Sequence, residues 1–107
     1  MSDNSALVFN TALTASMGSS STLGTIDISE ANYVAAQYVW TGNPVGQITL
    51  SLSNDNVNFV DYDTPTPGGT PSTSIMEGKI MPFKYIKIAY TRTSGTGTLT
   101  VYVSGKR

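Results

Sequence analysis

The sequence predicts an all-β protein: a single antiparallel β-sandwich of jelly-roll type, with about eight strands, over residues 1–107. Apolar and polar residues alternate with a period of two in several segments, as in strands with one buried and one exposed face. The chain contains 13 serines, 15 threonines and 10 glycines, and 12% of its residues are charged. Such a composition favours strands joined by polar turns. Because no segment longer than two helical turns has an apolar stripe with capping residues, we expect no helix.

Eight segments are predicted to be strands, and the alternation is clear in four of them. The clear strands are Ala35 to Thr41, Gln47 to Ser53, Tyr85 to Thr91 and Thr98 to Ser104. The weaker ones are Leu7 to Asn10, Thr25 to Ile28, Asn58 to Tyr62 and Ser74 to Ile80. The apolar phase of these strands predicts a core of Ile48, Leu50, Leu52, Phe59, Ile86, Ile88, Leu99, Val101 and Val103.

Turn residues separate the predicted strands. Thr41 to Gly46, Ser53 to Asn56 and Ser94 to Gly97 are predicted turns, because Gly and Asn tolerate positive φ and Pro restricts φ. Residues 64–73 hold three of the five prolines and no apolar anchor, so we expect an exposed loop. Residues 1–22, which include a polar and flexible stretch at residues 16–21, are expected to be a flexible arm or an edge strand.

The composition excludes most enzyme classes and cofactors. With no His and no Cys, the chain lacks the commonest general base, thiol nucleophiles, disulfides and the usual zinc, copper, haem and iron–sulfur ligands. The serines lack a suitable base nearby, so we expect no catalytic residue, no metal and no cofactor. Six scattered bases and a pI near 5.0 argue against nucleic-acid binding. No signal peptide or membrane segment is evident, so we expect no membrane partner.

The charges are divided along the chain, since all seven acidic residues precede all six basic ones. One interpretation is that basic strands pair beside acidic strands, so that the opposite charges cancel each other's electric field. The other is that an acidic patch meets the basic patch of a neighbouring subunit. We favour the first interpretation, because the two halves of a sandwich sequence often interleave.

Three aspartates form the one acidic cluster. Asp61 and Asp63 are two residues apart, so on a regular strand their carboxylates would share a face, as a hard-cation site or an acid/base pair requires. The simpler interpretation is an exposed edge strand, with Asp55 capping an Asx turn. We favour the simpler one, because no glycine-anchored ligand loop accompanies the cluster.

Aromatic residues provide candidate binding surfaces. Trp40 and Tyr62 are candidate glycan contacts, because sugar-binding modules present such rings to their ligands, although a core or rim position is favoured for Trp40. Tyr85 and Tyr102 lie on the outward phase of their strands, and with Lys87 they are candidate interface residues.

Three longer runs carry a family resemblance. They are Tyr38-Val39-Trp40-Thr41-Gly42-Asn43-Pro44-Val45-Gly46, Ser53-Asn54-Asp55-Asn56-Val57-Asn58-Phe59, and residues 82–99, beginning Pro82-Phe83-Lys84-Tyr85-Ile86-Lys87-Ile88. In this order they resemble small virion proteins of bacteriophages, which are similar to discoidin-like β-sandwiches. Phe59 stands where that pattern often has Trp, and residues 1–30 show no match. The resemblance implies a structural role.

These observations lead to an expected function. We expect a non-enzymatic virion protein, an accessory head protein that decorates and stabilises the particle through other virion proteins and many symmetric copies. The alternatives are a tail or spike component and a carbohydrate-binding adhesion module. A hydrolase that uses Asp61 and Asp63 is the weakest hypothesis.

Overall fold

The computed structural model describes the backbone of residues 7–67, 72–80 and 83–106, and the side chains of residues 9–67 and 83–106. Within these residues the chain forms strands and no helix. The strands are β1 (Leu7–Ser16), β2 (Ser21–Asp27), β3 (Tyr33–Trp40), β4 (Val45–Ser53), β5 (Val60–Asp63), β6 (Ser72–Ile80), β7 (Tyr85–Ser94) and β8 (Thr98–Lys106). The predicted all-β class is confirmed.

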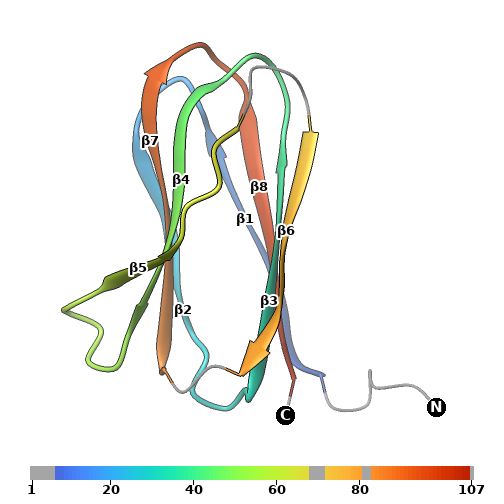
Figure 1. Cartoon of the computed structure of the whole chain (residues 1–107), viewed down its shortest axis with the longest axis vertical. Coiled ribbons are helices and arrows are strands. Elements are labelled where there is room, and N and C mark those ends of the chain that lie inside the picture. Colours follow the sequence, from blue (N-terminus) through green and yellow to red (C-terminus); the bar gives the residue numbers. More distant parts are fainter. Residues whose placement is uncertain (1–6, 68–71, 81–82, 107) are drawn as a thin grey trace.

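The strands form two antiparallel sheets that pack face to face (Figure 1). Sheet 1 has the order β1-β8-β3-β6, and sheet 2 has the order β2-β7-β4-β5. Apart from β4 and β5, consecutive strands lie in different sheets, so the chain crosses repeatedly between the two layers. Two four-stranded sheets interleaved in this way form a jelly roll.

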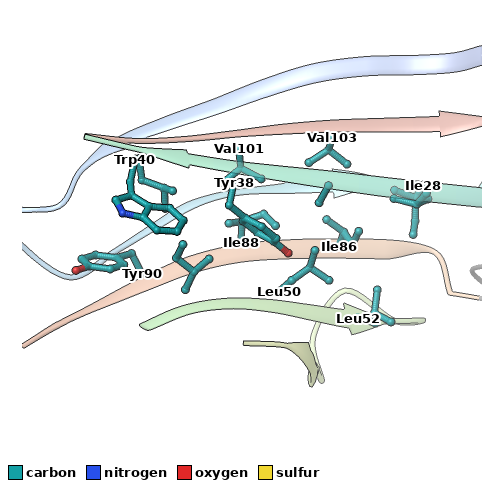
Figure 2. Close-up of a cluster of buried hydrophobic side chains, with 14 of the residues drawn as sticks. Ile28, Tyr38, Trp40, Leu50, Leu52, Ile86, Ile88, Tyr90, Val101 and Val103 are labelled. Carbon is teal, nitrogen blue, oxygen red and sulfur yellow. The ribbon is translucent and has the colours of Figure 1, made fainter. Parts of the chain in front are cut away.

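The core fills the space between β3 and β8 on one side and β4 and β7 on the other (Figure 2). Eight of the nine predicted core residues are buried: Ile48, Leu50, Leu52, Ile86, Ile88, Leu99, Val101 and Val103. The aromatic rings of Tyr38, Trp40 and Tyr90 join them. Strands β3, β7 and β8 bury alternate residues along the core, because side chains alternate between the two faces of a sheet.

Phe59 is the ninth predicted core residue, and that prediction is wrong. It lies in the loop between β4 and β5 and is half-buried. Its ring faces the ammonium group of Lys87, with 4.4 Å between Nζ and the ring centroid. Because Lys87 belongs to the outward phase of β7, this cation–π contact places Phe59 outside the sandwich.

The N-terminal part of the described chain is more ordered than we expected. Strand β1 continues to Ser16, and the Met17 backbone N–H donates to the Gly97 carbonyl at 2.8 Å. The Met17 side chain is fully buried. A ten-residue strand paired with β8 therefore replaces the predicted short strand, and of the two expectations for residues 1–22 the edge strand describes residues 7–16.

Other boundaries also differ from the predictions. Strand β2 begins at Ser21, four residues before the expected start. Residues 64–73 do not form one exposed loop: the Ile48 N–H donates to the Pro65 carbonyl at 3.0 Å, Pro67 is buried, and residues 72–73 belong to β6. Residues 68–71, in the middle of that predicted loop, lie outside the described part of the chain.

Two loops interlock at one end of the sandwich. The Thr41 N–H donates to the Thr98 carbonyl and the Asn43 N–H donates to the Thr96 carbonyl, both at 3.0 Å. Gly42 and Gly95 both have a φ of 77°, as expected for turn glycines. The backbones approach so closely that a side chain at either glycine would meet a carbonyl oxygen of the other loop.

Candidate functional site

The two aspartates of β5 lie on opposite sides of their strand. Asp61 pairs with Ser51 and Asp63 pairs with Leu50, so the register shifts by one residue between them. Asp61 accepts a hydrogen bond from the Ser51 hydroxyl at 3.2 Å on the outer face of sheet 2. Asp63 accepts one from the buried Tyr38 hydroxyl at 3.1 Å, on the core side. The expectation of a shared face is therefore wrong, because a β-bulge adds one residue and reverses the alternation.

Asp55 forms the Asx turn that the sequence predicts. Its Oδ1 accepts hydrogen bonds from the backbone N–H groups of Val57 and Asn58 at 2.9 and 2.8 Å, and from the Ser53 hydroxyl at 2.8 Å. Its Oδ2 accepts from the side-chain amide of Asn58 at 2.8 Å. These hydrogen bonds, led by the backbone bonds from Asn58 and Val57, hold the pKa of the Asp55 carboxyl well below its usual range.

The arrangement of acids gives no metal centre in the described part of the chain. No group of three or more acidic side chains gathers within coordinating range among those residues.

A depression in the surface is lined by Phe9, Asp27, Ser29 and Glu30. Its Asp27 carboxylate already accepts hydrogen bonds from the Ser29 hydroxyl at 2.6 Å and the Ser29 N–H at 2.9 Å. These bonds lower the pKa of Asp27 and hold a local turn between Asp27 and Ser29.

The two candidate glycan contacts have different environments. Trp40 is 6% exposed and packs in the core near Tyr90, so it presents no ring face to a sugar (Figure 2). Tyr62 is 45% exposed and belongs to the edge strand β5. With the loop before it, β5 extends away from the sheet pair (Figure 1). The structure does not bring the two rings together.

The three candidate interface residues occupy two opposite faces. Tyr102 lies on the outer face of sheet 1 and is 47% exposed. Tyr85 and Lys87 lie on the outer face of sheet 2 and are half-buried, with Lys87 partly covered by Phe59. One partner surface therefore cannot contact all three.

On β1, β8 and β3, the strands of sheet 1 whose side chains are described, the outer face is almost free of charge. Tyr102 stands in a row between Ala12 of β1 and Gln37 of β3. The outward residues described on the three strands are Asn10, Ala12, Thr14, Ser16, Tyr33, Ala35, Gln37, Val39, Thr98, Thr100, Tyr102, Ser104 and Lys106. Lys106 is the one charged residue among them, and Tyr33 is a second tyrosine with 47% exposure.

Part of this face was not predicted from the sequence, because the predicted first strand ends at Asn10 and Tyr33 precedes the predicted third strand. A local signal was present, since Asn10, Ala12, Thr14 and Ser16 alternate with Phe9, Thr11, Leu13 and Ala15. The inward positions of that alternation include Thr11 and Ala15, which are less hydrophobic than Phe9 and Leu13. The alternation of apolar and polar residues is therefore less distinct in β1 than in β4 and β8.

The charges of sheet 2 interleave, as the favoured interpretation of the charge division expects. Strand β7, which carries Lys87 and Arg92, lies between β2, which ends at Asp27, and β4, whose neighbour β5 carries Asp61. Lys84, just before β7, contributes to lowering the pKa of Asp27. The jelly-roll topology thus places the basic strand β7 directly beside β2, which ends at Asp27, and one strand away from β5, which carries Asp61 and Asp63.

Among the described residues no helix is long and apolar enough to cross a membrane.

Comparisons with known proteins show the fold. The chain is similar to PirA with a TM-score of 0.61 and 10% identity, over 88% of this chain and 92% of that chain. It is similar to a subunit of Bacillus endospore appendages, described as disulfide-linked pili, with a TM-score of 0.51 and 15% identity over 92% and 87% of the two chains. It is also similar to the SPBc2 prophage-derived protein YomS, with a TM-score of 0.53 and 10% identity over 92% of this chain and 96% of that chain. No protein-family model matches the chain, and no curated protein is similar to it in sequence. At these identities the shared property is the β-sandwich fold.

Proposed function

We propose that this chain is a non-enzymatic structural protein of a bacteriophage virion, and specifically an accessory head protein that decorates and stabilises the particle. The observation that carries the proposal is the outer face of sheet 1. Its described part, on β1, β3 and β8, carries mainly Thr, Ser, Ala and Gln side chains and the exposed tyrosines Tyr33 and Tyr102, which suits docking onto another protein rather than catalysis. Tyr102 is the anchor, because tyrosine contributes a large contact area with little loss of side-chain entropy.

Docking on this face would act through many equal contacts. Each subunit contributes the same nearly uncharged patch, so symmetric copies around a particle add their affinities and strengthen attachment. Hydrogen bonds from the threonine and serine hydroxyls would set the orientation, and burial of Tyr102 would supply contact energy. In this proposal neither a cofactor nor a nucleic-acid partner takes part.

Two observations support a structural role over an enzymatic one. Asp61 and Asp63 bind different partners on opposite sides of β5, so they do not form an acid/base pair. The sandwich fold is shared with a prophage-derived protein and with an appendage subunit. Because this chain has no cysteine, it cannot use the disulfide linkage described for those appendages.

Quantitative mass spectrometry of purified particles tests the proposal. We expect this protein in on the order of hundreds of copies, in a fixed ratio to the major capsid protein, as an icosahedral lattice requires. A few copies in a small cyclic multiple would replace the head assignment with a tail or vertex assignment. Absence from the particles would reject the virion role, and a glycan-binding screen would then test the adhesion alternative.

A further inference from the structure

Each sheet of the sandwich has two edge strands, and an edge strand exposes backbone N–H and C=O groups that another strand can bind. Proteins usually block such edges with charges, bulges, prolines or short strands. Strand β5 is four residues long, has a register shift beside it and carries two aspartates. Strand β2 has a register shift at Thr22/Gly24 and ends at Asp27. The sequence of β6 contains Glu77 and Lys79.

Strand β1 has none of these protections over most of its length. Its ten residues, LVFNTALTAS, include no charged residue, no proline and no glycine. Its register with β8 is regular from Phe9 to Ser16, and the one irregularity lies at the beginning, between Leu7 and Phe9. A long, uncharged edge with a regular register favours pairing with another strand.

The ladder geometry shows which backbone groups face the open edge. The Met17 N–H donates to the Gly97 carbonyl on the β8 side. In an antiparallel ladder, alternate residues direct both backbone groups to the same neighbour, so the odd-numbered residues of β1 face β8. The even-numbered residues Asn10, Ala12, Thr14 and Ser16 therefore direct their N–H and C=O groups away from sheet 1. Their side chains are exposed on its outer face.

We propose that β1 pairs antiparallel with β1 of a second copy of this chain, which joins two four-stranded sheets into one eight-stranded sheet. Pairing about a two-fold axis brings equivalent residues near the axis close together, so a charge there would lie beside its own copy. Strand β1 carries no charge. An axis through Ala12 places Ala12 opposite Ala12 of the second copy and Asn10 opposite Thr14 of the second copy. All these side chains are small and uncharged.

The dimer would also extend the docking face. Ala12 neighbours Tyr102 on β8. In the dimer the strand order would be β8-β1-β1-β8, so the two β8 strands would lie three strand spacings apart, on the order of 14 Å. Both copies of Tyr102 would then project from the same side of one continuous sheet. On the inner side, the half-buried Phe9 and Leu13 lie near the new junction, where the second copy would cover them further. This dimer does not depend on the virion role.

Charge-swap variants at Ala12 test the pairing. Sedimentation of the whole chain between about 1 µM and about 1 mM should show a reversible monomer–dimer equilibrium. Ala12→Lys and Ala12→Glu should each weaken self-association by about tenfold or more, because like charges meet at the axis. An equimolar mixture of the two variants should associate again as a heterodimer, since Lys then faces Glu.

Gln37→Lys is the matched control. Gln37 is exposed in the same row of the same face, two strands from the edge, so this variant adds the same charge and should dimerise like the wild type. A wild type that stays monomeric throughout the range would overturn the proposal. Dimerisation of Ala12→Lys with wild-type affinity would also overturn it, because another surface would then form the dimer.

Residue-specific hydrogen exchange provides an independent measurement on the wild type. Raising the concentration should slow exchange at the amides of Asn10, Ala12 and Thr14, which face the open edge. The amides of Thr11 and Leu13, which face β8, should be protected at every concentration. Unchanged exchange at Asn10, Ala12 and Thr14 in a demonstrated dimer would show that β1 is not the interface.

Discussion

The Tyr38 hydroxyl donates a hydrogen bond to Oδ2 of Asp63 at 3.1 Å, and this bond links the two sheets of the sandwich. Tyr38 belongs to β3 in sheet 1 and is fully buried, and Asp63 belongs to the edge strand β5 of sheet 2. Burial and the neighbouring Asp63 carboxylate raise the pKa of Tyr38 well above its usual range, so the hydroxyl stays protonated and donates. The bond ties a short edge strand to the opposite layer.

Removal of this bond should destabilise the protein. Tyr38→Phe is expected to lower the free energy of unfolding by about 1–2 kcal/mol, since the bond joins a hydroxyl to a carboxylate. Asp63→Ala should cost at least as much, because it leaves the buried hydroxyl without this acceptor. Urea unfolding of both variants and of the double variant gives the coupling energy. Strictly additive effects would show that the two groups do not interact in solution.

The Asp55 turn should make stability depend on pH in the acid range. The folded state lowers the pKa of Asp55 below its unfolded value of about 4, so the contribution of the ionised carboxylate is complete above that pH. It is lost as the pH falls toward the lowered folded value. Asp55→Asn keeps the shape and an acceptor oxygen but removes the charge. It should therefore be less stable than the wild type at pH 7 and approach it at low pH.

Thermal unfolding of both proteins between about pH 7 and about pH 2 measures this difference. Asp27, whose pKa is also lowered by its bonds with Ser29, remains in both proteins and contributes equally to their acid sensitivity. A stability difference between wild type and variant that does not change with pH would contradict the assignment of a charge-dependent turn.

The interlocked loops should not tolerate a side chain at Gly95. Its φ of 77° is unfavourable for other residues, and an added Cβ would meet the Asn43 carbonyl oxygen. We expect Gly95→Ala to lower the free energy of unfolding by about 2 kcal/mol or more. Gly18→Ala is the control, because its Cβ would lie 3.4 Å from the nearest atom, the Ser16 hydroxyl oxygen. Equal stability of the two variants in urea would show that the loops do not pack this closely.

Tyr102 and Tyr62 distinguish docking from sugar binding, because they have nearly equal exposure, 47% and 45%, on different parts of the molecule. If the proposed docking face is right, Tyr102→Ala should weaken attachment to particles by about tenfold or more and Tyr62→Ala should not. If the chain is instead a glycan-binding module, we expect saturable sugar binding that is lost in Tyr62→Ala and kept in Tyr102→Ala. Co-sedimentation with particles and a glycan array measure the two activities.

The local pattern of the sequence was sufficient to predict the fold class and most of the core residues. Alternation with a period of two identifies inward residues such as Ile86 and Val101, because side chains on a strand alternate regardless of which strand lies beside it. The Asx turn at Asp55 was equally predictable, since its partners lie within three residues. The glycine turns followed from the same short-range chemistry.

Tertiary structure alone decided how these elements meet. Asp61 and Asp63 were expected on one face, and the bulge that separates them depends on the register between β4 and β5. Tyr85 and Tyr102 are both outward residues, but which sheet each strand joins is set by pairing between distant parts of the chain. Phe59 could be placed outside the core only once Lys87 was placed beside its loop. The alternation of side chains is a property of each strand by itself, whereas register, sheet membership and edges arise from long-range pairing that no local segment encodes.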